Sequence, residues 1–226
     1  MKTLIALISA CSILAAATLP AQANVFGNPV PGMKSGEAML QASLSSDTRQ
    51  VFLPGLDQTL NLSLSETMLA LGFAIGDKGL LGFKYGLALA VPSGRSAVST
   101  GSEGGFFYRH MISDPGSVRH GLALSYHWGG VGDDTSTEYF SQIDVSYGIS
   151  FKASPETDLY VAGLFSTVSG SMDTYYAPYY SYALESTMNL GAYAGVEYKA
   201  SSAFVLGVEA RLLASTGLAA FAQARF

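Results

Sequence analysis

The sequence has little charge and almost no cysteine. Only 13% of its 226 residues are charged, and no basic run suggests a nucleic-acid partner. The only cysteine, Cys11, lies in a segment that we expect to be removed, so the mature chain would hold no disulfide. Outside that segment, no apolar run reaches the ~20 residues of a membrane-spanning helix. Yet 49% of the residues are hydrophobic, which leaves a very apolar soluble domain or a membrane β-barrel.

The first 23 residues have the layout of a secretory signal peptide. Lys2 precedes an apolar stretch, Leu4–Leu19, and Ala21-Gln22-Ala23 forms a small-residue cleavage site. The stretch is shorter than a spanning helix requires. The sequence therefore predicts a leader at 1–23 that is cut after Ala23, a periplasmic N-terminal arm at 24–36 and a barrel at 37–226.

Apolar residues recur at every second position in segment after segment. In 80–91, for example, Leu81, Phe83 and Tyr85 alternate with small or polar residues, and 139–151 and 204–212 follow the same pattern. The segments approach the ~9–11 residues of a tilted membrane crossing, longer than typical globular strands. The fold class that these features predict is all-β, a transmembrane antiparallel up-and-down barrel.

The strand count rests on how these segments are divided. We predict ten strands, with eight as the alternative. Leu60, Leu62 and Leu64 are out of phase with Leu69 and Leu71, so either a bulge near 65–68 or a strand that extends above the membrane is expected. Short connections alternate with longer ones, as periplasmic turns alternate with extracellular loops in outer-membrane barrels. The predicted strands lie near 37–45, 66–75, 80–91, 105–112, 118–129, 138–151, 158–169, 183–198, 203–212 and 217–226.

The last strand carries a specific pattern. Apolar residues alternate up to a terminal aromatic residue, at Leu218, Ala220, Ala222, Ala224 and Phe226. Together with the leader and the alternating strands, this pattern resembles the small Gram-negative outer-membrane β-barrel proteins. The resemblance implies that the last strand is the signal read by the barrel-insertion machinery. It also implies a location in the bacterial outer membrane and contact with outer-membrane lipid.

The face of the strands opposite the apolar one holds charges of both signs. A barrel of eight to ten strands is narrow, and side chains largely fill it. We therefore expect a lumen plugged by paired charges, and a narrow porin-like path for ions or small solutes is the alternative. The residues of this predicted polar network are Lys84, Arg109, Asp144, Glu185, Glu197, Glu209 and Arg211, with Arg225 on the same face.

A hydrolase is a further alternative. Ser125 and His127 share one strand face, and Asp133 and Asp134 follow in the next connection. No acidic partner has the spacing of a known motif, and we expect no catalytic residue. The three isolated histidines suggest no metal site, and nothing in the sequence indicates a cofactor.

Tyrosines concentrate in one predicted extracellular loop, at Tyr175, Tyr176, Tyr179, Tyr180 and Tyr182. Such loops offer large amphipathic contact area at a low entropic cost. The loop is the candidate site for an unknown extracellular ligand, and packing over the barrel mouth is the alternative. The sequence thus favours a non-enzymatic structural or surface-interaction protein of the outer membrane.

Overall fold

The computed structural model describes residues 25–92, 99–134, 136–175, 180–187 and 189–226. The predicted leader at 1–23 lies outside these residues. Within them, no helix is long and apolar enough to cross a membrane. The described chain forms strands β1 (Ala38–Leu53), β2 (Gln58–Ile75), β3 (Gly79–Pro92), β4 (Ser99–Ser113), β5 (Val118–Gly132), β6 (Ser136–Lys152), β7 (Thr157–Thr174), β8 (Tyr180–Ser186), β9 (Leu190–Ser201), β10 (Phe204–Leu213) and β11 (Thr216–Arg225).

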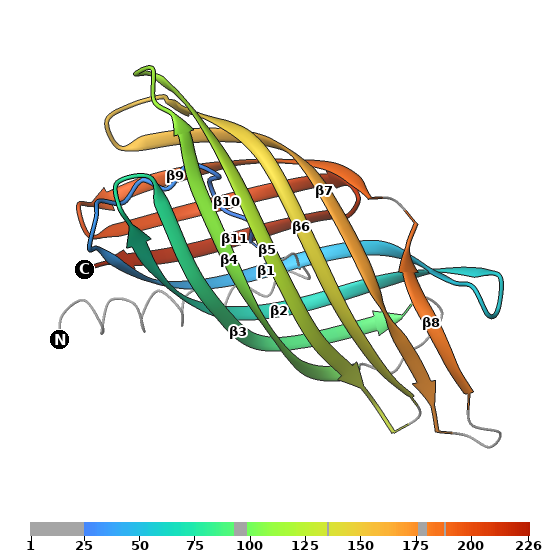
Figure 1. Cartoon of the computed structure of the whole chain (residues 1–226). Coiled ribbons are helices and arrows are strands. Elements are labelled where there is room, and N and C mark those ends of the chain that lie inside the picture. Colours follow the sequence, from blue (N-terminus) through green and yellow to red (C-terminus); the bar gives the residue numbers. More distant parts are fainter. Residues whose placement is uncertain (1–24, 93–98, 135, 176–179, 188) are drawn as a thin grey trace.

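Ten of these strands close into an antiparallel barrel (Figure 1). The order runs from β1 to β7 and then through β9, β10 and β11. β11 returns to pair with β1, from Met39 opposite Arg225 to Thr48 opposite Thr216. Closure leaves no open sheet edge, which is the requirement for strands in lipid. The all-β barrel with ten strands, predicted from the alternation, is confirmed.

β8 stands outside this ring of ten. It pairs with the far end of β7, where Ser169 lies opposite Glu185, and with the end of β1, where Val51 lies opposite Ser186. β10 and β11 stop short of that level, because their hairpin turns at residues 214–215. Beyond the hairpin, β8 therefore bridges β7 to β1. The single strand predicted for 183–198 is in fact two strands, β8 and β9.

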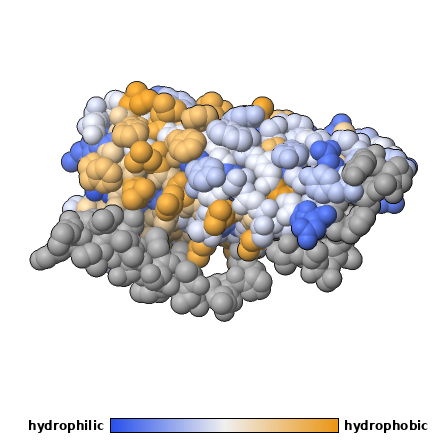
Figure 2. Space-filling model, turned by 90° about the horizontal axis from the view of Figure 1, so that it is seen from below, coloured by the Kyte–Doolittle hydropathy of each residue, from blue (hydrophilic) through white to orange (hydrophobic). Residues whose placement is uncertain are grey.

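The outer surface divides into two zones along the strands. Near the end where β11 terminates, large apolar side chains form an exposed belt, seen as the orange half of Figure 2. It includes Phe73, Leu81, Tyr147 and Val161. The opposite half of Figure 2 is blue to white. We call that half the collar; its exposed polar residues include Thr48, Gln50, Thr59, Asn61, Thr67, Thr100, Ser102 and Ser169.

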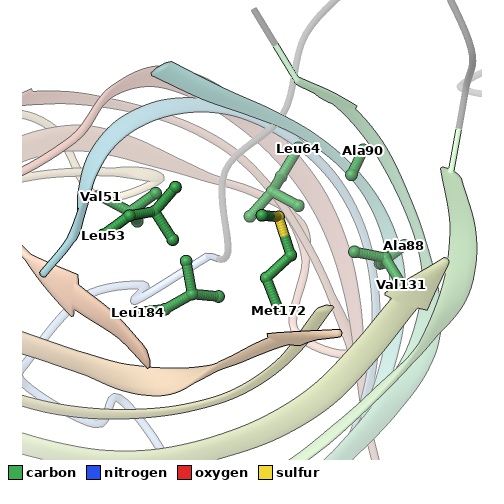
Figure 3. Packing of buried hydrophobic residues seen from close by; sticks show 8 residues of the cluster. All are labelled: Val51, Leu53, Leu64, Ala88, Ala90, Val131, Met172 and Leu184. Carbon is green, nitrogen blue, oxygen red and sulfur yellow. The ribbon is translucent and has the colours of Figure 1, made fainter. Parts of the chain in front are cut away.

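The interior of the collar is apolar. A buried cluster, here the lumenal apolar cluster, lies inside the barrel at this level (Figure 3). The connections left between the predicted strands at 46–65 and 170–182 are mostly strand, because the collar buries one of their faces as a soluble barrel does. The cluster consists of Val51, Leu53, Leu64, Ala88, Ala90, Val131, Met172 and Leu184.

The change of phase in β2 follows from these two zones. β2 pairs with β1 in one unbroken register from Gln58 to Phe73, so no bulge interrupts it. Leu64 points into the collar and is fully buried, whereas Leu69 and Leu71 point outward in the belt. The strand thus extends beyond the belt, which was one of the two explanations that the sequence allowed.

Residues 25–33 lie inside the barrel, at the end where the C-terminus lies (Figure 1). Val25, Phe26, Val30 and Met33 are buried there. A turn follows, in which Glu37 N–H donates to the Lys34 carbonyl (3.1 Å), and β1 begins at Ala38. We refer to residues 25–33 as the arm. Its position in the lumen differs from the prediction, which placed residues 24–36 in the periplasm.

Candidate functional site within the lumen

The structure brings most of the predicted polar network into the lumen. Lys84, Arg109, Asp144, Glu197, Glu209 and Arg211 are all buried. Glu185 is exposed instead. It lies on β8, where the neighbouring residue Leu184 is the one that faces inward. Glu66, Glu103, Arg119 and Asp158 are also buried, and the predicted network did not include them. Each of the four lies at an inward-facing position in the alternation of its strand, β2, β4, β5 or β7, and that position could have predicted its burial.

One charge group centres on His127. Lys84 Nζ lies 3.0 Å from His127 Nε2, and Ser125 Oγ lies 2.9 Å from the same nitrogen. Asp144 Oδ2 is 3.2 Å from it and accepts a hydrogen bond from Ser125 Oγ (3.0 Å). Gln142 Nε2 donates to the other carboxylate oxygen at 2.8 Å. Side chains of β3, β5 and β6 thus meet in one compact polar group in the barrel interior.

This group differs from a hydrolytic triad. In a triad the histidine uses one ring nitrogen for the serine and the other for the acid. Here Ser125, Asp144 and Lys84 all meet Nε2 of His127. The acids proposed from the sequence lie elsewhere: Asp133 accepts from the Ser136 backbone N–H at 2.9 Å, and Asp134 is exposed. The arrangement suits mutual neutralisation of buried charge rather than proton relay.

A second charge group surrounds Glu209. Its carboxylate accepts the backbone N–H groups of Phe26 (3.1 Å) and Gly27 (2.8 Å) and the hydroxyl of Tyr160 (3.1 Å). Arg211 Nε lies 3.4 Å from the same carboxylate. A charged acceptor in a dry interior requires several such donors, and here the arm supplies two of them.

A third charge group lies near the short turns. Asp158 Oδ2 pairs with Arg119 at 3.1 Å and with Lys199 at 2.8 Å. Arg119 also donates to Ser150 Oγ at 3.2 Å. Ser150 in turn accepts from Asn28 Nδ2 at 3.0 Å, so this group also reaches the arm.

Aromatic rings occupy the space that inward glycines leave. Phe107 packs over Gly82, and Phe221 packs over Gly207. One cavity in the lumen, among the described residues, has a volume of about 20 Å³, which suits one or two water molecules. A second cavity, beside the β10–β11 hairpin, has about 10 Å³. Aromatic side chains thus take up space that a narrow path for solutes would need.

The tyrosines of the predicted binding loop differ in exposure. Tyr175 and Tyr180 are exposed, and the Tyr175 hydroxyl lies 2.6 Å from Thr137 Oγ1. Tyr182 is half-buried against the lumenal apolar cluster. Tyr176 and Tyr179 lie outside the described residues. Tyr175 therefore sits on the collar surface, as does the exposed Tyr139 of the neighbouring strand β6. Tyr180 shares one face of β8 with Tyr182, and their ring centroids are 5.8 Å apart.

The last strand closes the barrel as well as ending the sequence. Phe226 N–H donates to the Ala38 carbonyl (3.0 Å), and Ala38 N–H donates back (2.8 Å). The side chains of Leu218 and Phe226 are exposed, and Ala220 is half-buried. Ala222 and Ala224 are buried. The role of these five residues in insertion stays a prediction.

Comparison with known proteins adds the fold class. No family model and no curated protein matches the sequence. The translocator domain of the autotransporter NalP from Neisseria meningitidis matches in structure with a TM-score of 0.52 and 11% identity, over 86% of this chain and 89% of that one. The outer membrane protease OmpT from Escherichia coli gives a TM-score of 0.47 and 9% identity, over 84% and 94%. An outer membrane channel from Pseudomonas putida F1 gives 0.45 and 10%, over 90% and 100%.

The chain thus has the fold of the outer-membrane β-barrel proteins. The structures that it resembles include a translocator, a protease and a channel, so the fold assigns none of these activities to it.

Proposed function

We propose that the protein is a non-enzymatic outer-membrane barrel that is closed to solutes and presents its collar to the cell exterior as an interaction surface. The observation that carries the proposal is the filled lumen. The arm, three charge groups and the lumenal apolar cluster occupy the lumen, and two cavities among the described residues have volumes of only about 20 and 10 Å³, room for one or two waters. A structure of this kind is suited to display rather than to conduction.

The collar supports the display role. Its exposed tyrosines, Tyr139, Tyr175 and Tyr180, stand on or beside paired strands rather than on a free loop. Aromatic side chains that are held by a rigid scaffold lose little entropy on binding and dominate many recognition surfaces. An extracellular ligand that presents flat or apolar groups fits such a surface.

Two measurements test the proposal. In planar bilayers, the full-length protein is expected to give no steady conductance, whereas reproducible steps would support the narrow channel instead. On arrays of glycans and proteins, the purified barrel is expected to bind at least one probe through the collar. The double variant Tyr175→Ala/Tyr180→Ala should lose that binding, and Tyr147→Ala, a belt residue, should keep it. Binding to no probe, or equal binding by both variants, would contradict the display role.

A catalytic role is tested separately. The geometry around His127 supports charge neutralisation, so overexpression should leave the lipid A and phospholipid profiles of the cell unchanged. A profile that shifts with the wild type and not with Ser125→Ala would argue for a hydrolase.

A further inference from the structure

The lumen holds the arm by contacts that specify its sequence. Phe26 stacks on Tyr193 with ring centroids 5.0 Å apart, and the Arg211 guanidinium lies 4.0 Å from the Phe26 centroid. Tyr160 and Leu164 belong to the same buried cluster. An aromatic ring between a tyrosine and a guanidinium gains both stacking and cation–π attraction. The lumen therefore contains a subsite for an aromatic side chain.

The next residue must be glycine. A Cβ at Gly27 would lie 2.6–2.8 Å from the atoms of the Arg109 guanidinium, and the backbone there has a φ of +69°. The N–H groups of Phe26 and Gly27 both donate to Glu209. This second subsite thus binds two backbone N–H groups and has no room for a side chain at the second residue.

A third subsite receives proline. Gly121 and Gly148 lie opposite each other on β5 and β6, and a Cβ at either would meet Pro29. Pro29 and Pro31 have no N–H group, so an extended segment that contains them needs few hydrogen-bond partners inside a narrow lumen. Asn28, between Gly27 and Pro29, donates to Glu197 at 3.3 Å.

On the collar side, the lumenal apolar cluster lies between the arm and the end of the barrel (Figure 3). On the other side, the Arg225 side chain donates to the Gly32 carbonyl at 2.6 Å. A single turn there joins the arm to β1. It includes Gly36, which has a φ of +83° and where an added Cβ would meet no atom within 4 Å. The turn that joins the arm to β1 thus contains a glycine with open space beside it. The arm can therefore leave the lumen toward the short-turn end without breaking the pairing of any strand.

We propose that the lumen is a peptide-binding pocket, that it faces the short-turn end, and that the arm is its exchangeable occupant. Its ligands are extended peptides with an aromatic residue followed by glycine, any residue that can donate a hydrogen bond, and proline. The tether gives the arm an effective concentration on the order of mM, so a second peptide enters only when the arm is absent or released. This pocket is independent of the collar, and its test does not depend on whether the barrel conducts.

The test uses a deletion variant that lacks residues 25–33, together with the fluorescein-labelled peptide VFGNPVPGM, which copies the arm. A heat-modifiability gel first establishes that the deleted barrel is folded. Fluorescence anisotropy should then show saturable binding to the deleted barrel and at least 100-fold weaker binding to the full-length protein. Peptides that carry Phe26→Ala or Gly27→Ala should bind at least tenfold more weakly. A folded deletion variant that does not bind the peptide, or binds all three peptides equally, overturns the proposal.

A second measurement keeps the full-length chain, in case the deletion prevents folding. Val30→Cys in a Cys11→Ser background places a single thiol on the buried arm. Gly121→Ala adds a Cβ that meets Pro29, whereas Gly163→Ala adds one on the outer face with nothing within 4 Å. Maleimide should label Val30→Cys at least tenfold faster in the Gly121→Ala protein than in the Gly163→Ala control. Equal rates in the two proteins would overturn the exchange of the arm.

Discussion

At the scale of single residues, the buried charges are stable because they have several partners. Asp144 contacts Ser125, Gln142 and His127, and it lies on the strand beside that of His127. Taking a charge out of water is costly unless hydrogen bonds and opposite charges surround it. The alternation along the strands brings such partners together, because every second residue of neighbouring strands faces the same narrow lumen.

Removal of Asp144 should therefore be more harmful than removal of an exposed carboxylate. Asp144→Ala removes the carboxylate of the His127 group, which leaves the charge of Lys84 less compensated, and it is expected to lower the free energy of unfolding by about 3 kcal/mol. Urea unfolding in micelles, followed by gel mobility, measures this. Asp134→Ala, at an exposed site on the β5–β6 connection, is the matched control and should change stability by less than about 0.5 kcal/mol. Equal effects of the two substitutions would mean that the charge group contributes nothing.

At the scale of elements, the last strand combines two roles that a substitution can separate. The backbone hydrogen bonds between Phe226 and Ala38 close the barrel without using the side chain of Phe226. The exposed ring of Phe226 is therefore available for recognition during insertion. We expect Phe226→Ala to lower the outer-membrane level several-fold while the inserted fraction keeps its heat-modifiable mobility.

A suitable control is another exposed apolar residue of the same outer surface. Leu190 is 67% exposed, close to the 71% of Phe226, but it lies on β9. Leu190→Ala should leave outer-membrane levels near those of the wild type. If the two variants reach the same level, the ring of Phe226 acts only as lipid contact area and the insertion signal is refuted.

Strands were predictable from sequence where one face met lipid and the other met the lumen. Phe73, Leu81 and Tyr147 all face outward as the alternation predicted. The strands of the collar were harder to predict, because there the apolar residues face inward and the polar residues face outward. Leu64 therefore seemed out of phase with the apolar residues of the belt. A pattern of period two does not say which solvent surrounds the strand.

The arm could not be predicted by periodicity at all. Residues 25–33 form no strand and have no repeating pattern. The position of the arm depends on contacts distant in sequence, such as those of Phe26 with Tyr193 and of Gly27 with Glu209. Prolines at 29 and 31 were the one local indication of an extended segment, and they carry no information on where it lies. The separation of β8 from β9 also depends on residues distant in sequence, since the β10–β11 hairpin ends at that level.

At the scale of the whole molecule, one barrel is adapted to two surroundings. In the belt, apolar side chains face outward and charges face the lumen. In the collar, the two faces exchange roles within the same continuous strands, such as β2. The boundary between these zones should coincide with the membrane surface, because exposed Thr and Gln side chains are costly in hydrocarbon.

Trp128 marks this boundary. It is the only tryptophan of the chain, and it faces outward on β5, beside Phe106 with ring centroids 5.4 Å apart. Leu124 lies four residues closer to the short-turn end of the same strand, on the same face. Aromatic residues favour the headgroup region, so Trp128 should lie shallow in the bilayer and Leu124 deeper.

Quenching by brominated lipids measures these depths. Trp128 should be quenched more by bromine at the 6,7 positions of the acyl chain than by bromine at the 11,12 positions. In the double variant Trp128→Phe/Leu124→Trp, the order should reverse, since that tryptophan faces the middle of the belt. If neither tryptophan is quenched, the apolar belt does not contact lipid. If both prefer the same lipid, the boundary between belt and collar is not the membrane surface, and the collar would then lie within the bilayer rather than outside it.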